Sequence, residues 1–332
     1  MLRVYLDQNK WIDLARAATG HSSGARYVDA LNAARAAAAA GTASFPLDMF
    51  RYAETGKRAN ERSRNDVADV MIELSRQHTM ALGRDILPAE VDGALKVRYG
   101  RPGQPRQVEV FGVGARHVTK EGVTWPELDE SKLRAAAGDI PERHYPEIQK
   151  IYTRLIEEQV LRAGPEVVRA AGLNPDTRHI DQQYVDYENM IGSEIRARGL
   201  AGDMIDLAVR ASDLGDIRTA VTEALNRVGL TWEEFLEDLG PGGVVGFMDD
   251  LPIRYVTNVM RSAKLRQAEQ KWELNDFNDI LALPVAAVYC DVVVTEAQWE
   301  HRLTQGKIEA RYGTKVLRSV ADLADILAAS PN

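Results

Sequence analysis

Four acidic residues beside apolar segments constrain the possible folds of this chain most strongly. Asp7 directly follows the apolar run 4–6, and Glu296 directly follows the apolar run 288–295. Both runs are too continuous for strands with one face in water, so we expect strands buried on both faces, as in a parallel sheet. Parallel strands deliver the residues that follow them to one crevice at their carboxyl ends. The sequence therefore predicts an α/β fold with a central parallel sheet and carboxylates at one edge.

The other two acids, Glu54 and Asp279, lie among apolar neighbours, which indicates that they face inward. Several carboxylates in one pocket repel and raise one another's pKa, and a divalent cation relieves this repulsion. Oxygen ligands favour Mg²⁺ or Mn²⁺ over zinc, and the single cysteine, Cys290, and the six histidines form no zinc motif. The predicted metal ligands, which are also the predicted catalytic residues, are Asp7, Glu54, Asp279 and Glu296.

Three segments carry a resemblance to a known family. Residues 4–9 read VYLDQN, residues 44–54 combine SFPL with YAE, and residues 275–299 contain Asp279 and the run VVVTE. In this order and spacing they resemble the PIN and PIN-like nucleases, whose opening strand ends in Asp-x-Asn and whose closing strand ends in Thr and an acid. Glu296 departs from that pattern, because it follows Thr295 directly where many relatives have an Asp one place later.

The resemblance implies a PIN-like three-layer fold and a metal-dependent nuclease that hydrolyses phosphodiester bonds, with RNA as the preferred substrate. It also suggests a role as a toxin or in defence. One or two ions would activate water for this reaction, so no side-chain nucleophile is required. Two alternatives stay open: a DNA nuclease or other hydrolase of phosphate esters on the same acids, and a non-catalytic PIN-like interaction module.

Two Gly- and Pro-rich segments, 100–105 and 240–243, break the chain. Its length of 332 residues suggests one or two domains. We predict that residues 1–94 and 251–332 form the two halves of a PIN-like domain. Residues 95–250 are predicted to be a mostly helical insertion between them.

Helical segments are expected on both sides of these breaks. The insertion is predicted to contain helices over 146–163 and 217–239, and a helix over 253–271 is predicted to lead back to the sheet. Near the N-terminus, the alanine tract 36–40 extends a predicted helix that begins near Tyr27.

The net charge of −8 argues against a nucleic-acid binder with a generally basic surface. It does not exclude a nuclease, because acids around a metal account for part of it and basic residues can be concentrated locally. Such residues follow Glu54 and occur again early in the middle segment, although runs of this kind are usually solvated helix faces. The candidate phosphate-binding residues are Lys57, Arg58, Arg101, Arg106 and Arg116.

Each candidate acid also has a structural interpretation. Asp7 would cap a helix that starts near Asn9, and Glu54 would be an ordinary surface acid. Asp276, one helical turn before Asp279, is a fifth candidate metal ligand, but it would also stabilise a helix N-terminus through the macrodipole. Three tryptophans are expected in packing and not as base-stacking platforms: Trp11, Trp272 and Trp299.

The sequence contains no apolar run of the roughly 18 residues that a membrane span needs. It opens on a segment expected to be a core strand, which leaves no room for a signal peptide, and one cysteine is compatible with a reducing compartment. We therefore expect a cytoplasmic protein with no membrane partner. The expected partners are a nucleic acid and, through the helical insertion, a second copy or another protein.

Overall fold

The computed structural model describes most of the chain. The described residues are 1–100, 108–119, 129–137, 140–170, 178–267 and 269–329. They belong to two compact units, and the chain enters each unit more than once. The first unit comprises Met1–Ala81, Phe111–Pro175 and Val320–Asn332, and the second comprises Leu82–Val110 and Asp176–Ser319.

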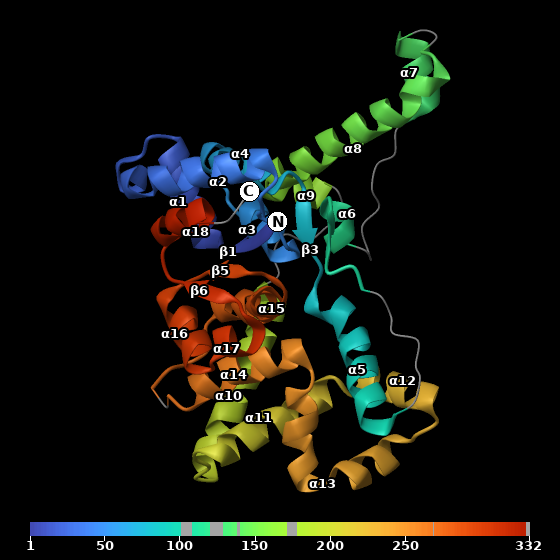
Figure 1. The fold of residues 1–332 in the computed structure, drawn as a ribbon, viewed down its shortest axis with the longest axis vertical. Coiled ribbons are helices and arrows are strands. Elements are labelled where there is room, and N and C mark those ends of the chain that lie inside the picture. The colour runs from blue at the N-terminus through green and yellow to red at the C-terminus, as the bar shows by residue number, and fades with distance from the viewer. Residues whose placement is uncertain (101–107, 120–128, 138–139, 171–177, 268, 330–332) are drawn as a thin grey trace. The chain divides into compact units, whose positions relative to one another are not determined.

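The first unit contains short strands among helices (Figure 1). Its elements are β1 (Leu2–Leu6), α1 (Gln8–Ala18), η1 (Ser22–Tyr27), α2 (Val28–Ala40), β2 (Ala43–Ser44), α3 (Met49–Gly56), α4 (Glu61–Ser75), β3 (His78–Met80), β4 (Phe111–Val113), α6 (Ala115–Val118), α7 (Glu130–Ala137), η2 (Glu142–His144), α8 (Tyr145–Arg162), α9 (Pro165–Ala170), η3 (Val320–Asp322) and α18 (Leu323–Ala329). β1 pairs in parallel with β2, with Leu2 opposite Ala43, and β3 pairs antiparallel with β4.

The core of the first unit forms around β1, whose last three residues, Val4 to Leu6, are fully buried. The prediction of a buried strand at 4–6 is therefore confirmed, as is the predicted helix that ends at Ala40. The C-terminal helix α18 packs against α2 and contributes the buried side chain of Leu323 (Figure 1). Residues from both ends of the described chain thus share this core.

The second unit is also mostly helical. Its elements are α5 (Gly83–Tyr99), α10 (Arg178–Ala197), α11 (Asp203–Asp216), α12 (Arg218–Val228), α13 (Trp232–Asp249), α14 (Pro252–Leu265), α15 (Leu274–Tyr289), β5 (Val292–Val294), α16 (Ala297–Gln305), α17 (Ile308–Tyr312) and β6 (Lys315–Leu317). β5 pairs in parallel with β6, with Val293 opposite Val316. One apolar core joins α5 to α11, α12 and α13 and includes Val91, Val221 and Phe235.

The coarse fold prediction is confirmed, since the chain is a mixed α/β protein with parallel strand pairs and predominantly helical structure. The three-layer PIN-like arrangement stays a prediction. The same holds for the boundaries after residues 94 and 250, neither of which coincides with a point where the chain crosses from one unit to the other. None of the helices among the described residues is both long and apolar enough to cross a membrane.

Two predicted segments differ from the observed elements near the second strand pair. The apolar run 288–295 was expected to be one strand, but α15 continues to Tyr289 and β5 covers only Val292–Val294. A continuous apolar run has no periodicity that separates a buried helix from a buried strand, so the pattern itself was ambiguous. The predicted helix over 253–271 ends at Leu265.

The predicted helices of the middle segment are found in part. The helix predicted over 146–163 is α8, whereas the segment 217–239 forms α12 and α13, because Gly229 ends α12 in the left-handed conformation with φ of 72°. The predicted break at 240–243 lies inside α13, where Gly240 has a non-helical backbone with φ of 58° and bends the helix. Of the other break, Gly100 ends α5 and residues 101–107 lie outside the described part of the chain.

Candidate acidic site

Asp7 stands between β1 and α1 in the first unit. The residue is 5 % exposed, and its Oδ1 accepts a hydrogen bond of 2.7 Å from the backbone N–H of Gln8. Asp7 is thereby the N-cap of α1, so the capping interpretation is confirmed. The same oxygen accepts a hydrogen bond of 2.5 Å from Nη1 of Arg51, which shows that Asp7 has a second role.

Arg51, on α3, is fully buried among carboxylates. Its guanidinium lies 2.5 Å from Asp7 Oδ1, 3.2 Å from Glu54 Oε2 and 3.8 Å from Asp48 Oδ1. Asp48, itself buried, caps α3 and accepts a hydrogen bond of 2.6 Å from the hydroxyl of Tyr5. We refer to these five residues as the Arg51 cluster.

Four residues of the Arg51 cluster are buried, and the fifth, Glu54, is partly exposed. Burial alone would lower the pKa of the Arg51 guanidinium, but Tyr5 and the carboxylates of Glu54, Asp48 and Asp7 raise it well above its usual value. Arg51 therefore stays charged at every ordinary pH. Three carboxylates surround this single guanidinium, so the cluster carries an excess of negative formal charge.

In the second unit the predicted acids lie along α15 and after β5. Asp276 is 3 % exposed, and its Oδ2 accepts hydrogen bonds of 2.5 Å from Lys264 Nζ and 2.6 Å from the backbone N–H of Glu273. It therefore belongs to a capping box at the start of α15, which confirms its interpretation as a residue of a helix N-terminus. Lys264 is buried as well and supplies the opposite charge.

Asp279 lies one turn further along α15 and is half-buried. Its Oδ2 accepts a hydrogen bond of 2.7 Å from the indole N–H of Trp299, on α16. Glu296 follows β5, is exposed, and is the N-cap residue of α16. Within the second unit, α16 thus connects two predicted ligands, because Glu296 is its N-cap residue and its Trp299 donates to Asp279.

The candidate phosphate-binding residues are only partly described. Lys57 and Arg116 are exposed, and Arg58 donates a hydrogen bond of 2.6 Å to the hydroxyl of Ser63. Arg101 and Arg106 lie outside the described residues. The predicted packing of Trp11, Trp272 and Trp299 is confirmed, since their exposed fractions are 0 %, 4 % and 0 %.

Sequence reasoning missed Arg51 and Lys264, which pair with predicted acids, and Asp48, which pairs with Arg51. The spacing of three residues between Arg51 and Glu54 was a signal for a helical ion pair, and Asp48 directly precedes α3 as a helix cap would. Nothing in the sequence signalled the pair between Lys264 and Asp276, because these residues come from different helices.

The structure brings Asp7 and Glu54 together at Arg51 in the first unit and links Asp279 to the helix that follows Glu296 in the second. Within either unit, the described residues do not gather three or more His, Cys, Asp or Glu side chains as they would around a metal ion. The common metal site of all four acids stays a prediction.

Comparison of the chain with models of known protein families, with curated proteins and with solved structures finds no match. The resemblance to PIN-like nucleases therefore rests on the sequence motifs alone.

Proposed function

We propose that this chain is a metal-dependent nuclease, specifically an endoribonuclease, that uses Mg²⁺ or Mn²⁺. The proposed ligands are Asp7 and Glu54 from the first unit and Asp279 and Glu296 from the second. We assign Asp276 to the start of α15 instead, because it already pairs with Lys264 and caps the helix. A bound ion would polarise the phosphoryl oxygen, lower the pKa of a water molecule and stabilise the leaving oxygen.

The observation that carries this proposal is the Arg51 cluster. In the sequence, α1, α2 and β2 all lie between Asp7 and Glu54, yet both carboxylates contact the same guanidinium. A single guanidinium leaves excess negative charge among three carboxylates, and a divalent ion neutralises such a group better than one guanidinium does. The cluster therefore supports cation binding by the two predicted ligands of the first unit.

The remaining parts of the proposal follow the sequence motifs. RNA is the proposed substrate, and Lys57, Arg58 and Arg116, with Arg101 and Arg106, are the proposed phosphate contacts. A cytoplasmic location, a toxin or defence role and a protein partner or second copy bound by the middle segment are proposed on the same basis.

The first experiment incubates the purified protein with RNA, DNA and a generic phosphate ester, in Mn²⁺ or in EDTA. Cleavage of RNA that EDTA abolishes is the expected result. Cleavage of DNA or of the ester in place of RNA would select the other hydrolase classes. No cleavage of any substrate by correctly folded protein would refute the enzymatic proposal.

Variants then test the residues. Asp7→Asn keeps a side chain that can cap α1 but removes the charge, so cleavage is expected to disappear while the melting temperature stays within a few degrees. Asp279→Asn is expected to behave in the same way. Asp325→Asn, an exposed acid on α18, is the matched control and should cleave RNA at the wild-type rate.

A second candidate is a non-catalytic interaction module, and one observation favours it. Arg51 and Lys264 already neutralise Asp7 and Asp276, so these acids have partners without any metal. For such a module, Mn²⁺ would neither stabilise the protein nor support cleavage. A thermal melting curve with and without Mn²⁺ distinguishes the two candidates before any substrate is known.

A further inference from the structure

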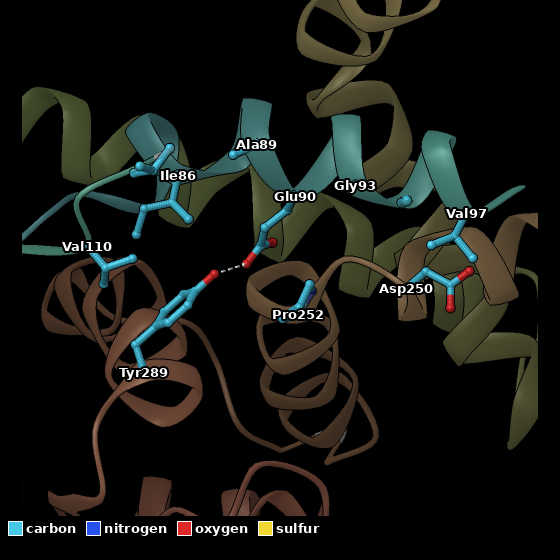
Figure 2. A pocket seen from close by; sticks show the side chains of 11 residues that line it. Ile86, Ala89, Glu90, Gly93, Val97, Val110, Asp250, Pro252 and Tyr289 are labelled. Carbon is cyan, nitrogen blue, oxygen red and sulfur yellow. Dashed lines mark hydrogen bonds between the residues drawn. The ribbon is translucent and has the colours of Figure 1, made fainter. Parts of the chain in front are cut away.

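The second unit contains a cavity of about 480 Å³ that the predicted acids do not line. It lies between α5, the start of α14 and the end of α15 (Figure 2), and Val108 and Val110 also line it. The volume is in the range of pockets that hold small organic ligands. The lining residues are Ile86, Ala89, Glu90, Gly93, Ala94, Val97, Val108, Val110, Asp250, Pro252 and Tyr289.

The walls of this cavity are mostly apolar, and the ionisable side chains that line it are all acidic. Two carboxyl groups, those of Glu90 and Asp250, belong to the lining residues, which include no Lys or Arg. An anion would meet repulsion there. An uncharged apolar molecule would fit the walls but would place no positive charge beside the two carboxyl groups, so a cation with an apolar body matches the cavity best.

Glu90 is the buried polar group of the cavity, with only 9 % of its surface exposed. It accepts a hydrogen bond of 2.9 Å from the Tyr289 hydroxyl (Figure 2). The backbone N–H of Ile253 donates to its two oxygens at 3.1 and 3.3 Å. A carboxylate offers about four acceptor positions, so these two donors leave room for a ligand to donate as well. Tyr289 and Ile253 thus fix the orientation of the carboxyl group without using all of its acceptor capacity.

A carboxyl group this deep in a helical core lowers the stability of the fold, because its charge is removed from water. Glu90 neighbours Val91 on α5, which is fully buried in the main core of the second unit. An apolar side chain at position 90 would avoid the desolvation of a charge, and strongly perturbed acids in pockets are typical of functional sites. A ligand that binds in the cavity next to Glu90 would explain why a carboxyl group occupies this buried position.

We propose that the cavity is a binding site for a small organic amine, whose ammonium group pairs with Glu90 and whose apolar body packs against α5. The ammonium donates hydrogen bonds to the free acceptor positions of the Glu90 carboxylate. Ile86, Ala89 and Val97 form the wall for the apolar body. This inference concerns the second unit only and does not depend on the proposed nuclease activity.

Amine binding at this site depends on pH. Burial raises the pKa of the Glu90 carboxyl to about 7, although the hydrogen bonds from Tyr289 and Ile253 and the charge of Arg254 act in the opposite direction. The other titratable groups near Glu90 keep one charge state in this range: burial lowers the pKa of Arg254 only to about 10, so it stays charged. The hydroxyls of Tyr289 and Tyr312 stay neutral, because burial raises the pKa of both. Glu90 therefore ionises between pH 6 and 8, while an alkyl ammonium stays charged.

The test compares three probes of equal chain length: hexylamine, hexanol and hexanoate. Their dissociation constants are measured by ligand-observed NMR titration of the full chain. We expect hexylamine to bind at least tenfold more tightly than either of the others at pH 8. Its affinity should fall about tenfold between pH 8 and pH 6, because the ionised fraction of a group with a pKa of about 7 changes by that factor.

Two variants assign the effect to Glu90. Glu90→Gln keeps an oxygen that accepts from Tyr289 and Ile253 but removes the charge, so hexylamine binding should weaken at least tenfold and lose its pH dependence. Asp85→Asn, on the same helix but not in the cavity wall, is the control and should bind as the wild type does.

Equal affinities of hexylamine and hexanol, or hexylamine binding that does not change with pH in the wild type, would overturn the proposal. The wild-type pH series also decides the question if Glu90→Gln does not fold.

Discussion

Replacing Arg51 by Gln tests how the carboxylates of the first unit are neutralised. Arg51 is fully buried and contacts Asp7, Asp48 and Glu54, of which Asp7 and Asp48 are buried too. Gln at position 51 would leave the three carboxylates that Arg51 contacts without a cation. We expect the variant to fold poorly in EDTA and to recover stability when a divalent ion takes the place of the guanidinium.

The expected loss of unfolding free energy follows from the burial of the Arg51 cluster. Removing one partner of a buried ion pair typically costs about 3–5 kcal/mol, because the remaining charge has neither water nor a counter-ion. For a domain of this size, that loss lowers the melting temperature by roughly 10 °C. Mn²⁺ at a hundredfold excess over its dissociation constant would restore about 2.7 kcal/mol, which is more than half of the loss.

The assay is urea unfolding followed by tryptophan fluorescence, with and without Mn²⁺. Trp11 is fully buried in the first unit and reports on its unfolding. Arg64→Gln is the matched control, because Arg64 is also buried but donates to the backbone carbonyls of Arg58 and Arg162. This control should be destabilised without any gain from Mn²⁺.

The reasoning would be refuted if Mn²⁺ stabilised Arg51→Gln no more than the wild type or the Arg64→Gln control. That result would mean that the carboxylates around Arg51 do not bind a divalent ion even when their internal cation is gone.

Three further predictions address the site, the buried carboxyl group and the proposed RNA contacts. Asp279→Asn should lower RNA cleavage at least a hundredfold, and an unchanged rate would remove Asp279 from the site. Glu90 has a folded-state pKa of about 7, above its value of about 4.3 in an unfolded chain. Its contribution to the unfolding free energy is therefore complete below pH 4.3 and is lost as the pH rises to 7. Unfolding free energy should therefore fall by about 3 kcal/mol across this range in the wild type but not in Glu90→Gln, as urea titrations at several pH values would measure. Neutralising the three arginines Arg101, Arg106 and Arg116 should weaken RNA binding and flatten its salt dependence, as filter binding at several salt concentrations would measure. Unchanged RNA affinity with loss of an oligomer in size-exclusion chromatography would instead identify an assembly surface.

The sequence predicted elements well where one periodic signal dominated. The buried strand at 4–6, the helix that ends at Ala40 and the helix α8 were all found where the patterns placed them. The apolar run 288–295 was assigned wrongly at its start, because a helix buried on all sides and a buried strand share the same composition. Only the packing of α15 within the second unit distinguishes a buried helix from a buried strand in this segment.

The candidate site shows a different limit of sequence reasoning. Asp7 was identified both as a ligand and as a helix cap, and the cap is present. Arg51 was missed, although it is the residue on which Asp7 and Glu54 meet. A charged residue in a short helix is usually solvated, and its burial depends on contacts with strand β1, which lies far away along the chain. Local patterns carry no information on such contacts.

The place of α18 in the first unit has a consequence for the order in which the protein folds during synthesis. Val320 and Leu323 complete the core that α1 and α2 begin, but the ribosome adds them only after residues 176–319. At a translation rate of about 5–20 residues per second, the ribosome needs on the order of ten seconds to reach the last residues of this core. A nascent chain stalled before residue 320 should therefore expose the apolar faces of α1 and α2 to chaperones, even though every other segment of the unit has already left the ribosome.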